Sequence, residues 1–135
     1  MLLMLRPLKR YADFAGRSRA AEYWSFQLGQ IAVLAGSYVL FASIVGFEPG
    51  AGTGKPVLAF QIFMALLVLF ALGTLVPLFA TQVRRLHDQA MSGWFLLLYL
   101  VPYLGELIVF FLMCRPGTIG PNRYGPDPRD EFTRP

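Results

Sequence analysis

Long apolar runs alternate with short polar segments along this chain. The runs cover residues 24–47, 57–81 and 94–114; the first two contain no charged residue, and the third contains only Glu106. Each run reaches the ~20 residues that a helix needs to cross ~30 Å of hydrocarbon. Strands are excluded because three of them cannot close a barrel and an open sheet edge cannot be satisfied in lipid. The pattern therefore predicts an all-α integral membrane protein with three hydrophobic helices.

The third run contains a break at its centre, which leaves two arrangements open. Residues 102–105 read Pro-Tyr-Leu-Gly, and proline and glycine both interrupt a helix. The run forms either one kinked span or a re-entrant pair of arms that turns between Pro102 and Gly105, each arm reaching about 12 Å. A re-entrant turn places backbone polar groups in mid-membrane, where only protein can satisfy them. For this reason we favour the kinked span.

The polar segments assign the two sides of the membrane in this single domain of 135 residues. Segment 1–23 is basic and is predicted to lie in the interface, 82–93 is a polar cytoplasmic connector, and 115–135 is a tail rich in proline and glycine. Segment 1–23 carries five Lys or Arg residues and the loop 48–56 carries one, so the positive-inside rule predicts a cytoplasmic N-terminus. A full third span puts the tail outside, and the re-entrant arrangement puts it in the cytoplasm.

Composition narrows the function classes. The chain is 56% hydrophobic and 15% charged, with a net charge of +4 and one cysteine. Soluble domains carry about 25% charged residues, so an ordinary soluble enzyme and a disordered chain are excluded, and one cysteine excludes an internal disulfide framework. The basic residues flank apolar runs, which favours membrane topology over nucleic-acid binding. We expect no nucleic acid, cofactor or metal ion as a partner.

A charged cluster follows the second apolar run. Arg84, Arg85, His87 and Asp88 lie three or four residues apart, which makes them neighbours on one helical surface. The functional interpretation is a site at the cytoplasmic surface that binds an anionic lipid headgroup or a partner. The competing interpretation is that the arginines set the topology while His87 and Asp88 cap and connect helices.

Further polar residues are predicted to lie on the same side of the membrane. Arg17, Arg19 and Glu22 precede the first apolar run, and Arg19 and Glu22 can pair at a spacing of three residues. The predicted topology therefore permits one polar constellation, made of Arg17, Arg19, Glu22, Arg84, Arg85, His87 and Asp88.

Glu106 is the one ionisable residue deep within a predicted span. A charge at that depth costs at least ~2.5 kcal/mol, so such residues usually face a partner or a cavity. It is a proton or cation site, a subunit contact, or a protonated, hydrogen-bonded acid that stabilises the kink.

The common signatures of enzymes are missing from the sequence: there is no G-x-S-x-G, P-loop or H-E-x-x-H. We predict no catalytic residue and interpret the chain as an accessory or interaction protein whose partners are membrane lipids, anionic ones included, a membrane protein or a second copy of itself. The alternative is a small oligomeric transporter or channel that uses Glu106. A lipid-modifying enzyme that uses His87 and Asp88 is the least favoured, because the pair has no nucleophile or metal partner.

Three stretches of sequence resemble a known family. They are YADFAGRSRAAEYW (11–24), RRLHDQAMSGW (84–94) and PGTIGPNRYGPDP (116–128), and their order and spacing agree with the DUF805 family of small bacterial inner-membrane proteins. Two positions depart from it: Ala20 stands where the family often has arginine, and Phe95 where it often has a second tryptophan. The resemblance implies a bacterial inner-membrane protein, and it supplies no substrate or catalytic residue. It also singles out a tail motif, made of Asn122, Arg123, Tyr124 and Asp127.

Overall fold

A computed structural model describes residues 3–45 and 55–130 of the chain. Its helices, in chain order, are the short 3-10 helix η1 (Leu3–Leu5), α1 (Arg6–Lys9), α2 (Ala20–Val45), α3 (Lys55–Asp88), the 3-10 helix η2 (Gly93–Leu100) and α4 (Leu104–Cys114). Within the described ranges, the extended backbone is limited to one isolated bridge between Asn122 and Gly125. The all-helical prediction is confirmed; the loop predicted at 48–56 lies mostly outside the described residues.

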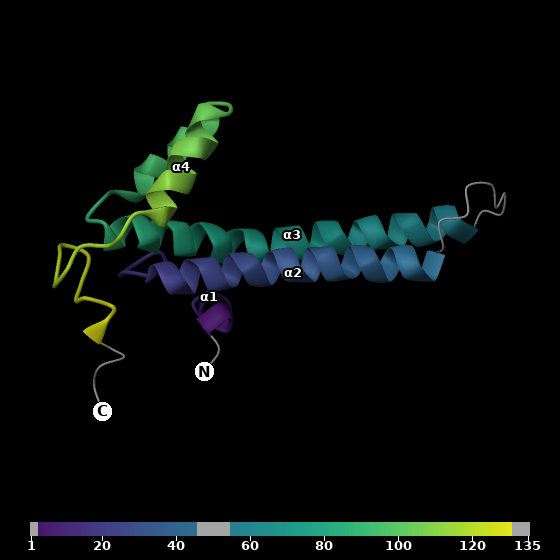
Figure 1. Ribbon diagram of the computed structural model, residues 1–135, viewed down its shortest axis with the longest axis horizontal. Coiled ribbons are helices and arrows are strands. Elements are labelled where there is room, and N and C mark those ends of the chain that lie inside the picture. The colour runs from purple at the N-terminus through teal and green to yellow at the C-terminus, as the bar shows by residue number, and fades with distance from the viewer. Residues whose placement is uncertain (1–2, 46–54, 131–135) are drawn as a thin grey trace.

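Helices α2 and α3 run side by side as a long antiparallel pair (Figure 1). They contain 26 and 34 residues, which correspond to lengths of roughly 39 and 51 Å. Both are long and apolar enough to cross a membrane. Their side chains stay largely exposed, as expected for a surface whose solvent is lipid. The connector predicted at 82–93 is helical as far as Asp88, so the charged cluster continues the second long helix.

The third apolar run forms a helical hairpin, so the continuous kinked span is wrong for this segment. Helix η2 ends at Leu100 and α4 begins at Leu104, with Tyr103 in a left-handed conformation (φ 63°) at the reversal. Gly105 permits the close approach of the two arms, because a β-carbon there would overlap the carbonyl oxygen of Leu98. Each arm is roughly 16 Å long, about half of a hydrocarbon core. The hairpin projects from the α2–α3 pair near the charged end of α3 (Figure 1).

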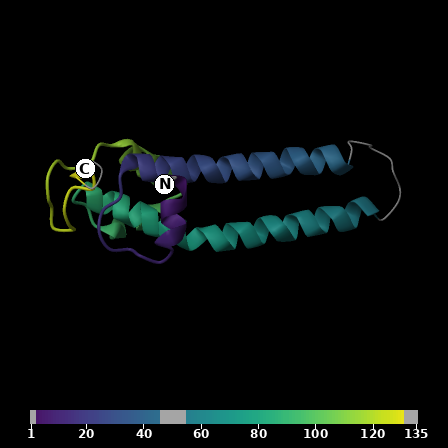
Figure 2. The same cartoon turned by 90° about the horizontal axis from the view of Figure 1, so that it is seen from below.

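The N-terminal segment crosses the long pair instead of following it. Figure 2 shows α1 lying across both long helices, in the half of the pair that also carries the tail. Met4 packs against Gly29 of α2, and the Tyr11 hydroxyl donates to the Gly73 carbonyl oxygen at 2.9 Å. That carbonyl lacks its helical donor because the residue four positions later, Pro77, has no N–H. Tyr11 thus compensates for the proline inside α3.

The small core lies where the hairpin meets the two long helices. Tyr23 of α2, Leu86 of α3, and Val109 and Met113 of α4 form one buried cluster. Trp24 packs against it and contacts Phe110 edge to face at 5.8 Å between ring centroids. Because apolar burial is concentrated here, this junction fixes how the hairpin is held relative to the pair.

Candidate functional site

The charged end of α3 is enclosed by two segments distant in sequence, the N-terminal linker 10–19 and the tail 115–130. We call the buried ionic residues gathered there the platform: Arg17, Glu22, Arg84, Arg85 and Asp88. Their side chains are all at most 6% exposed. Charged groups are seldom buried without partners, so the positions of those partners show what the platform does.

Asp88 lies at the centre of the platform and accepts from two arginines. Its Oδ1 receives Arg17 Nε at 3.0 Å and Nη2 at 2.9 Å, and its Oδ2 receives Arg85 Nη1 at 2.6 Å. The pairing of Arg85 with Asp88 follows from their spacing of three residues on α3. The pairing with Arg17 joins residues 71 positions apart. Asp88 therefore ties the N-terminal linker to the end of the second long helix.

The same two arginines also hold the tail. Arg17 donates to the carbonyl oxygens of Thr118 and Gly120, both at 2.6 Å, and Arg85 donates to the carbonyl oxygen of Arg115. The Thr118 N–H and hydroxyl both donate to the Asp88 carbonyl oxygen, at 2.8 and 3.0 Å. One carboxylate thus orients two guanidinium groups, and these fix the backbone of the tail.

Gly117 makes this close approach possible, because a β-carbon there would overlap the Asp88 carboxylate. Gly117 and Thr118 are functional positions that our prediction from residue chemistry does not single out. The signal for both is present in the PGTIG stretch of the family resemblance, since a glycine beside a polar residue in a tail suits close backbone contact.

A second buried pair lies on the side facing α2. Arg84 Nη2 is 3.6 Å from Glu22 Oε1 and donates to the Thr81 hydroxyl at 3.2 Å. The Ser18 N–H donates to the Arg84 carbonyl oxygen at 3.1 Å. Arg84 Nε and Nη1 and the Ser18 hydroxyl are buried with no hydrogen-bond partner among the described residues. The pair joins the start of α2 to the end of α3.

His87 forms part of an aromatic stack at the edge of the platform. Its ring lies on Tyr124 at 3.8 Å between centroids and 4° between planes, and the Arg123 guanidinium lies 4.7 Å from the centroid of the same Tyr124 ring. His87 Nδ1 lies 3.2 Å from the carbonyl oxygen of Gly16, which assigns the proton of the neutral ring to Nδ1. Asn122 donates to the His87 carbonyl oxygen at 2.9 Å. The tail motif therefore docks on the histidine that lies just beyond the two arginines of α3.

Asp127 closes the tail on itself. Its carboxylate accepts the N–H of Arg129 at 2.9 Å and that of Gly120 at 3.0 Å. These backbone donors, that of Arg129 above all, hold the pKa of the carboxyl below its usual value. The turn that they stabilise presents the Gly120 carbonyl oxygen to Arg17.

Two predicted residues lie apart from the ionic contacts above. Arg19 is partly buried at the start of α2, where its carbonyl oxygen accepts from the N–H groups of Glu22 and Tyr23. Glu106 is exposed on the first turn of α4, in the hairpin and not in the platform. The other predicted residues of the constellation, and the tail motif, meet at one end of the molecule.

The buried ionic groups of the platform hold the N-terminal linker and the tail against the end of α3, and we call this arrangement a clamp. In this conformation, Arg17, Arg84 and Arg85 are buried and bound to groups of the same chain, so an anionic headgroup reaches them only if the covering segments move away: the tail from Arg17 and Arg85, and the linker and the start of α2 from Arg84. Within the described ranges, no group of three or more His, Cys, Asp or Glu side chains is arranged to hold a metal ion.

Comparison with known proteins agrees with the resemblance seen in the sequence. Residues 11–126 match the family described as "Protein of unknown function (DUF805)". The chain is 37% identical to the inner membrane protein YhaH of Escherichia coli K12 over 127 residues, which is 94% of this chain and 96% of YhaH. It is 38% identical to the inner membrane protein YhaI of the same strain over 126 residues, 93% of each chain. No solved structure matches.

The matched region covers both long helices, the platform and the hairpin. Similarity to YhaH and YhaI, together with two helices of spanning length, assigns the protein to the bacterial inner membrane. The chain therefore belongs to the DUF805 family of proteins of unknown function.

Proposed function

We propose that this protein is an accessory protein of the inner membrane that presents an apolar hairpin to the cytoplasmic leaflet, where it contacts lipid, a membrane-protein partner or a second copy. Two spans anchor the chain, and the platform clamps the linker and tail at the cytoplasmic surface. The role is one of binding and not of catalysis, because the acidic and basic groups of the platform are paired with one another.

The hairpin is the observation that carries the proposal. It exposes large apolar side chains on both arms and at its tip, among them Trp94 at 77%, Leu100 at 78% and Tyr103 at 88%. A patch of this kind is unfavourable in water and marks a lipid or protein contact. Because each arm is roughly 16 Å long, the hairpin can enter one leaflet and return.

The distribution of charge supports the same topology. With a re-entrant hairpin, the N-terminal segment, the second connector and the tail share one side, which collects eleven of the twelve Lys and Arg residues and leaves Lys55 on the other. This is a strong positive-inside bias. Helix α1 lies across the spans, as expected for a segment in the membrane plane, and it carries two cationic residues, Arg6 and Lys9, of the kind that anionic headgroups attract.

The depth of the hairpin tip tests the proposal. In a variant with both native tryptophans replaced (Trp24→Phe, Trp94→Phe), tryptophan is introduced either by Tyr103→Trp at the tip or by Ile119→Trp in the tail. The two sites are a matched pair, since both side chains are 88% exposed. In vesicles that contain phospholipids brominated on the acyl chains, we expect strong quenching and blue-shifted emission for Tyr103→Trp and neither for Ile119→Trp.

Equal, water-like emission from both variants would show that the hairpin does not enter the lipid, and the proposal would be wrong. A reporter fused after Pro135 gives an independent check of topology. We expect it on the cytoplasmic side, together with the N-terminus. A periplasmic reporter would contradict the shared platform.

A further inference from the structure

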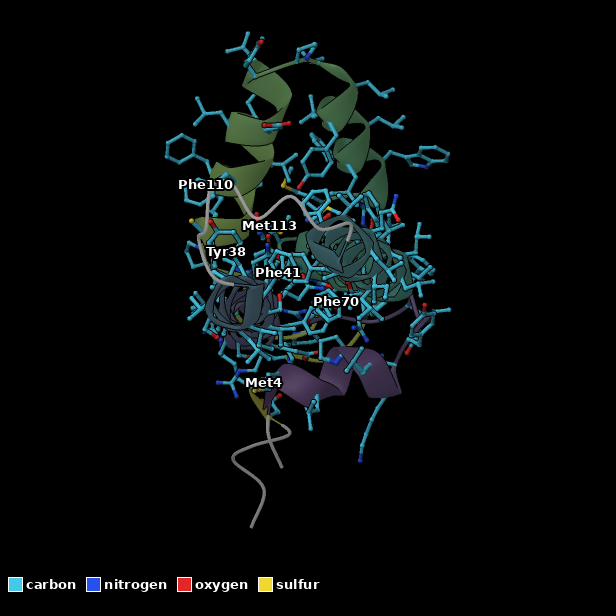
Figure 3. The ribbon with its side chains drawn as sticks, turned by 90° about the vertical axis from the view of Figure 1, so that its right-hand side faces the viewer. Met4, Tyr38, Phe41, Phe70, Phe110 and Met113 are labelled. Atoms are coloured by element: carbon cyan, nitrogen blue, oxygen red, sulfur yellow. The ribbon has the colours of Figure 1, made fainter. Side chains whose placement is uncertain are left out.

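The space between α2 and α3 contains a long apolar groove in the half of the pair away from the platform. Its cavity volume is about 520 Å³. The lining runs from Val33 to Ile44 on α2 and from Ala59 to Phe70 on α3. Figure 3, viewed along the pair, shows Phe41 and Phe70 in this space between the two ribbons. The helices meet across it where Phe41 stacks on Phe63, with 4.3 Å between ring centroids.

The chemistry of the lining specifies a hydrocarbon occupant. Apart from Ser37, the residues that line the groove are apolar, and the Ser37 hydroxyl already donates to the Leu34 carbonyl oxygen at 2.8 Å. No polar group of the lining therefore needs a partner, and an apolar cavity is a poor site for water or an ion. An unfilled space would forfeit dispersion contacts along its whole length.

The shape of the groove favours a thin chain over a helix. Val33 and Ile44 are eleven residues apart, so the groove is roughly 16 Å long. A helix with its side chains is ~10–12 Å across. Because Phe41 and Phe63 stack across the groove with 4.3 Å between ring centroids, a helix from a second copy does not fit between α2 and α3 without separating them.

The end of the groove nearer the platform offers positive charge. A smaller cavity of about 100 Å³ shares Val33 and Phe70 with the groove and is closed by Met4 and Leu8 of the N-terminal helices. The short helix α1 that supplies Leu8 also carries Arg6 and Lys9. An apolar tail in the groove would thus have its head toward the helix that carries these two cationic residues, which is the arrangement that an anionic lipid requires.

We propose that the groove between α2 and α3 holds one acyl chain of an anionic phospholipid whose phosphate lies at the basic residues of α1. This inference rests on the proposed membrane setting, and it names a ligand for the accessory role. The occupant is a lipid that stays with the protein, in contrast to the exchanging lipid around its outer surface.

The experiment measures phospholipid that is retained by the full-length protein after purification in mild detergent, by native mass spectrometry and by lipid extraction. The groove variant combines Ser37→Phe with Ala59→Phe. Its matched control combines Ser43→Phe with Ala65→Phe, because Ser43 and Ala65 are exposed positions of the same two helices outside the groove and the Ser43 hydroxyl is likewise bonded within its helix. We expect about one phospholipid per chain in the wild type and control, and a loss of at least tenfold in the groove variant.

A third variant, Arg6→Gln with Lys9→Gln, tests the head end. We expect the preference for phosphatidylglycerol over phosphatidylcholine in a competition assay to fall by about 5-fold for each basic residue removed. Equal retention by the groove variant and its control, or a wild type that retains no phospholipid, would overturn the proposal. So would a dimer that holds no lipid and dissociates in the groove variant, because a second copy would then fill the space. Quenching at Tyr103→Trp tests the hairpin separately and does not depend on any of these results.

Discussion

Replacement of Asp88 by asparagine tests the claim that the platform clamps the tail. The Asp88 carboxylate accepts from three guanidinium nitrogens of Arg17 and Arg85 at 2.6–3.0 Å, and all three side chains are nearly inaccessible to solvent. The substitution Asp88→Asn keeps the shape of the side chain but removes the negative charge between two buried cations.

The size of the effect follows from the burial of the pair. Breaking a buried ion pair by removing one partner costs about 3–5 kcal/mol. We take the value for one pair and not for two, because Arg17 and Arg85 keep carbonyl oxygens of the tail as acceptors. At 1.4 kcal/mol for each factor of ten, the docked state of the tail weakens by roughly 100- to 4000-fold.

Hydrogen exchange of the tail amides is the assay. The Thr118 N–H donates to the Asp88 carbonyl oxygen of α3, so the protection of this amide reports the docking equilibrium directly, whereas the Gly120 N–H donates to the Asp127 carboxylate and reports the turn within the tail. The matched control is Asp13→Asn, which breaks the Arg10–Asp13 pair, where both side chains are 41% exposed. Such a surface pair contributes at most ~1 kcal/mol. If Asp88→Asn left tail protection within the change seen for the control, the clamp would be wrong.

Three further predictions concern the same end of the molecule. Gly117→Ala should displace the tail and lower its exchange protection, because the new β-carbon would overlap the Asp88 carboxylate; unchanged protection would contradict the close approach. Tyr11→Phe should lower thermal stability in detergent by about 1 kcal/mol, since the Gly73 carbonyl oxygen loses its donor, and an equal unfolding midpoint would argue against the compensation. The pKa of Asp127 in the folded state lies below its usual value of 3.8, so its carboxylate stabilises the tail above pH 3.8, and this stabilisation is lost as the pH falls through the pKa of the folded state. Asp127→Asn should flatten this acid dependence of tail protection, and an unaltered pH profile would disprove the role of Asp127.

The candidate site was partly predictable because some of its geometry is local. Arg85 and Asp88 are three residues apart, and a continuous helix makes them neighbours wherever that helix lies. The roles of the arginines were less predictable. The interpretation as an exposed headgroup site treated them as surface charges, whereas the linker and the tail cover them from both sides. The pairing of Arg17 with Asp88 cannot be predicted from spacing along the chain, because the two residues are 71 positions apart.

The hairpin was likewise predictable from the sequence only in part. The break at Pro102 to Gly105 is visible in the sequence, and so is the choice between a kink and a turn. From the sequence, the cost of unsatisfied backbone groups at the tip of a turn favours the kink. The structure adds packing: Val109 and Met113 return to the core beside Tyr23 and Leu86, which a straight span could not do.

Composition and apolar run length alone determined that this is a helical membrane protein, because lipid requires every backbone group to find its partner within its own segment. The helical backbone, the lipid that surrounds it and the position at which charged residues begin all follow from that requirement and from the local sequence. Tertiary structure decided whether the third run continues as one helix or folds back on itself, and which charges meet in the platform. Those outcomes depend on groups brought together from the two ends of the chain, and the free energy of such contacts exists only once the chain is folded.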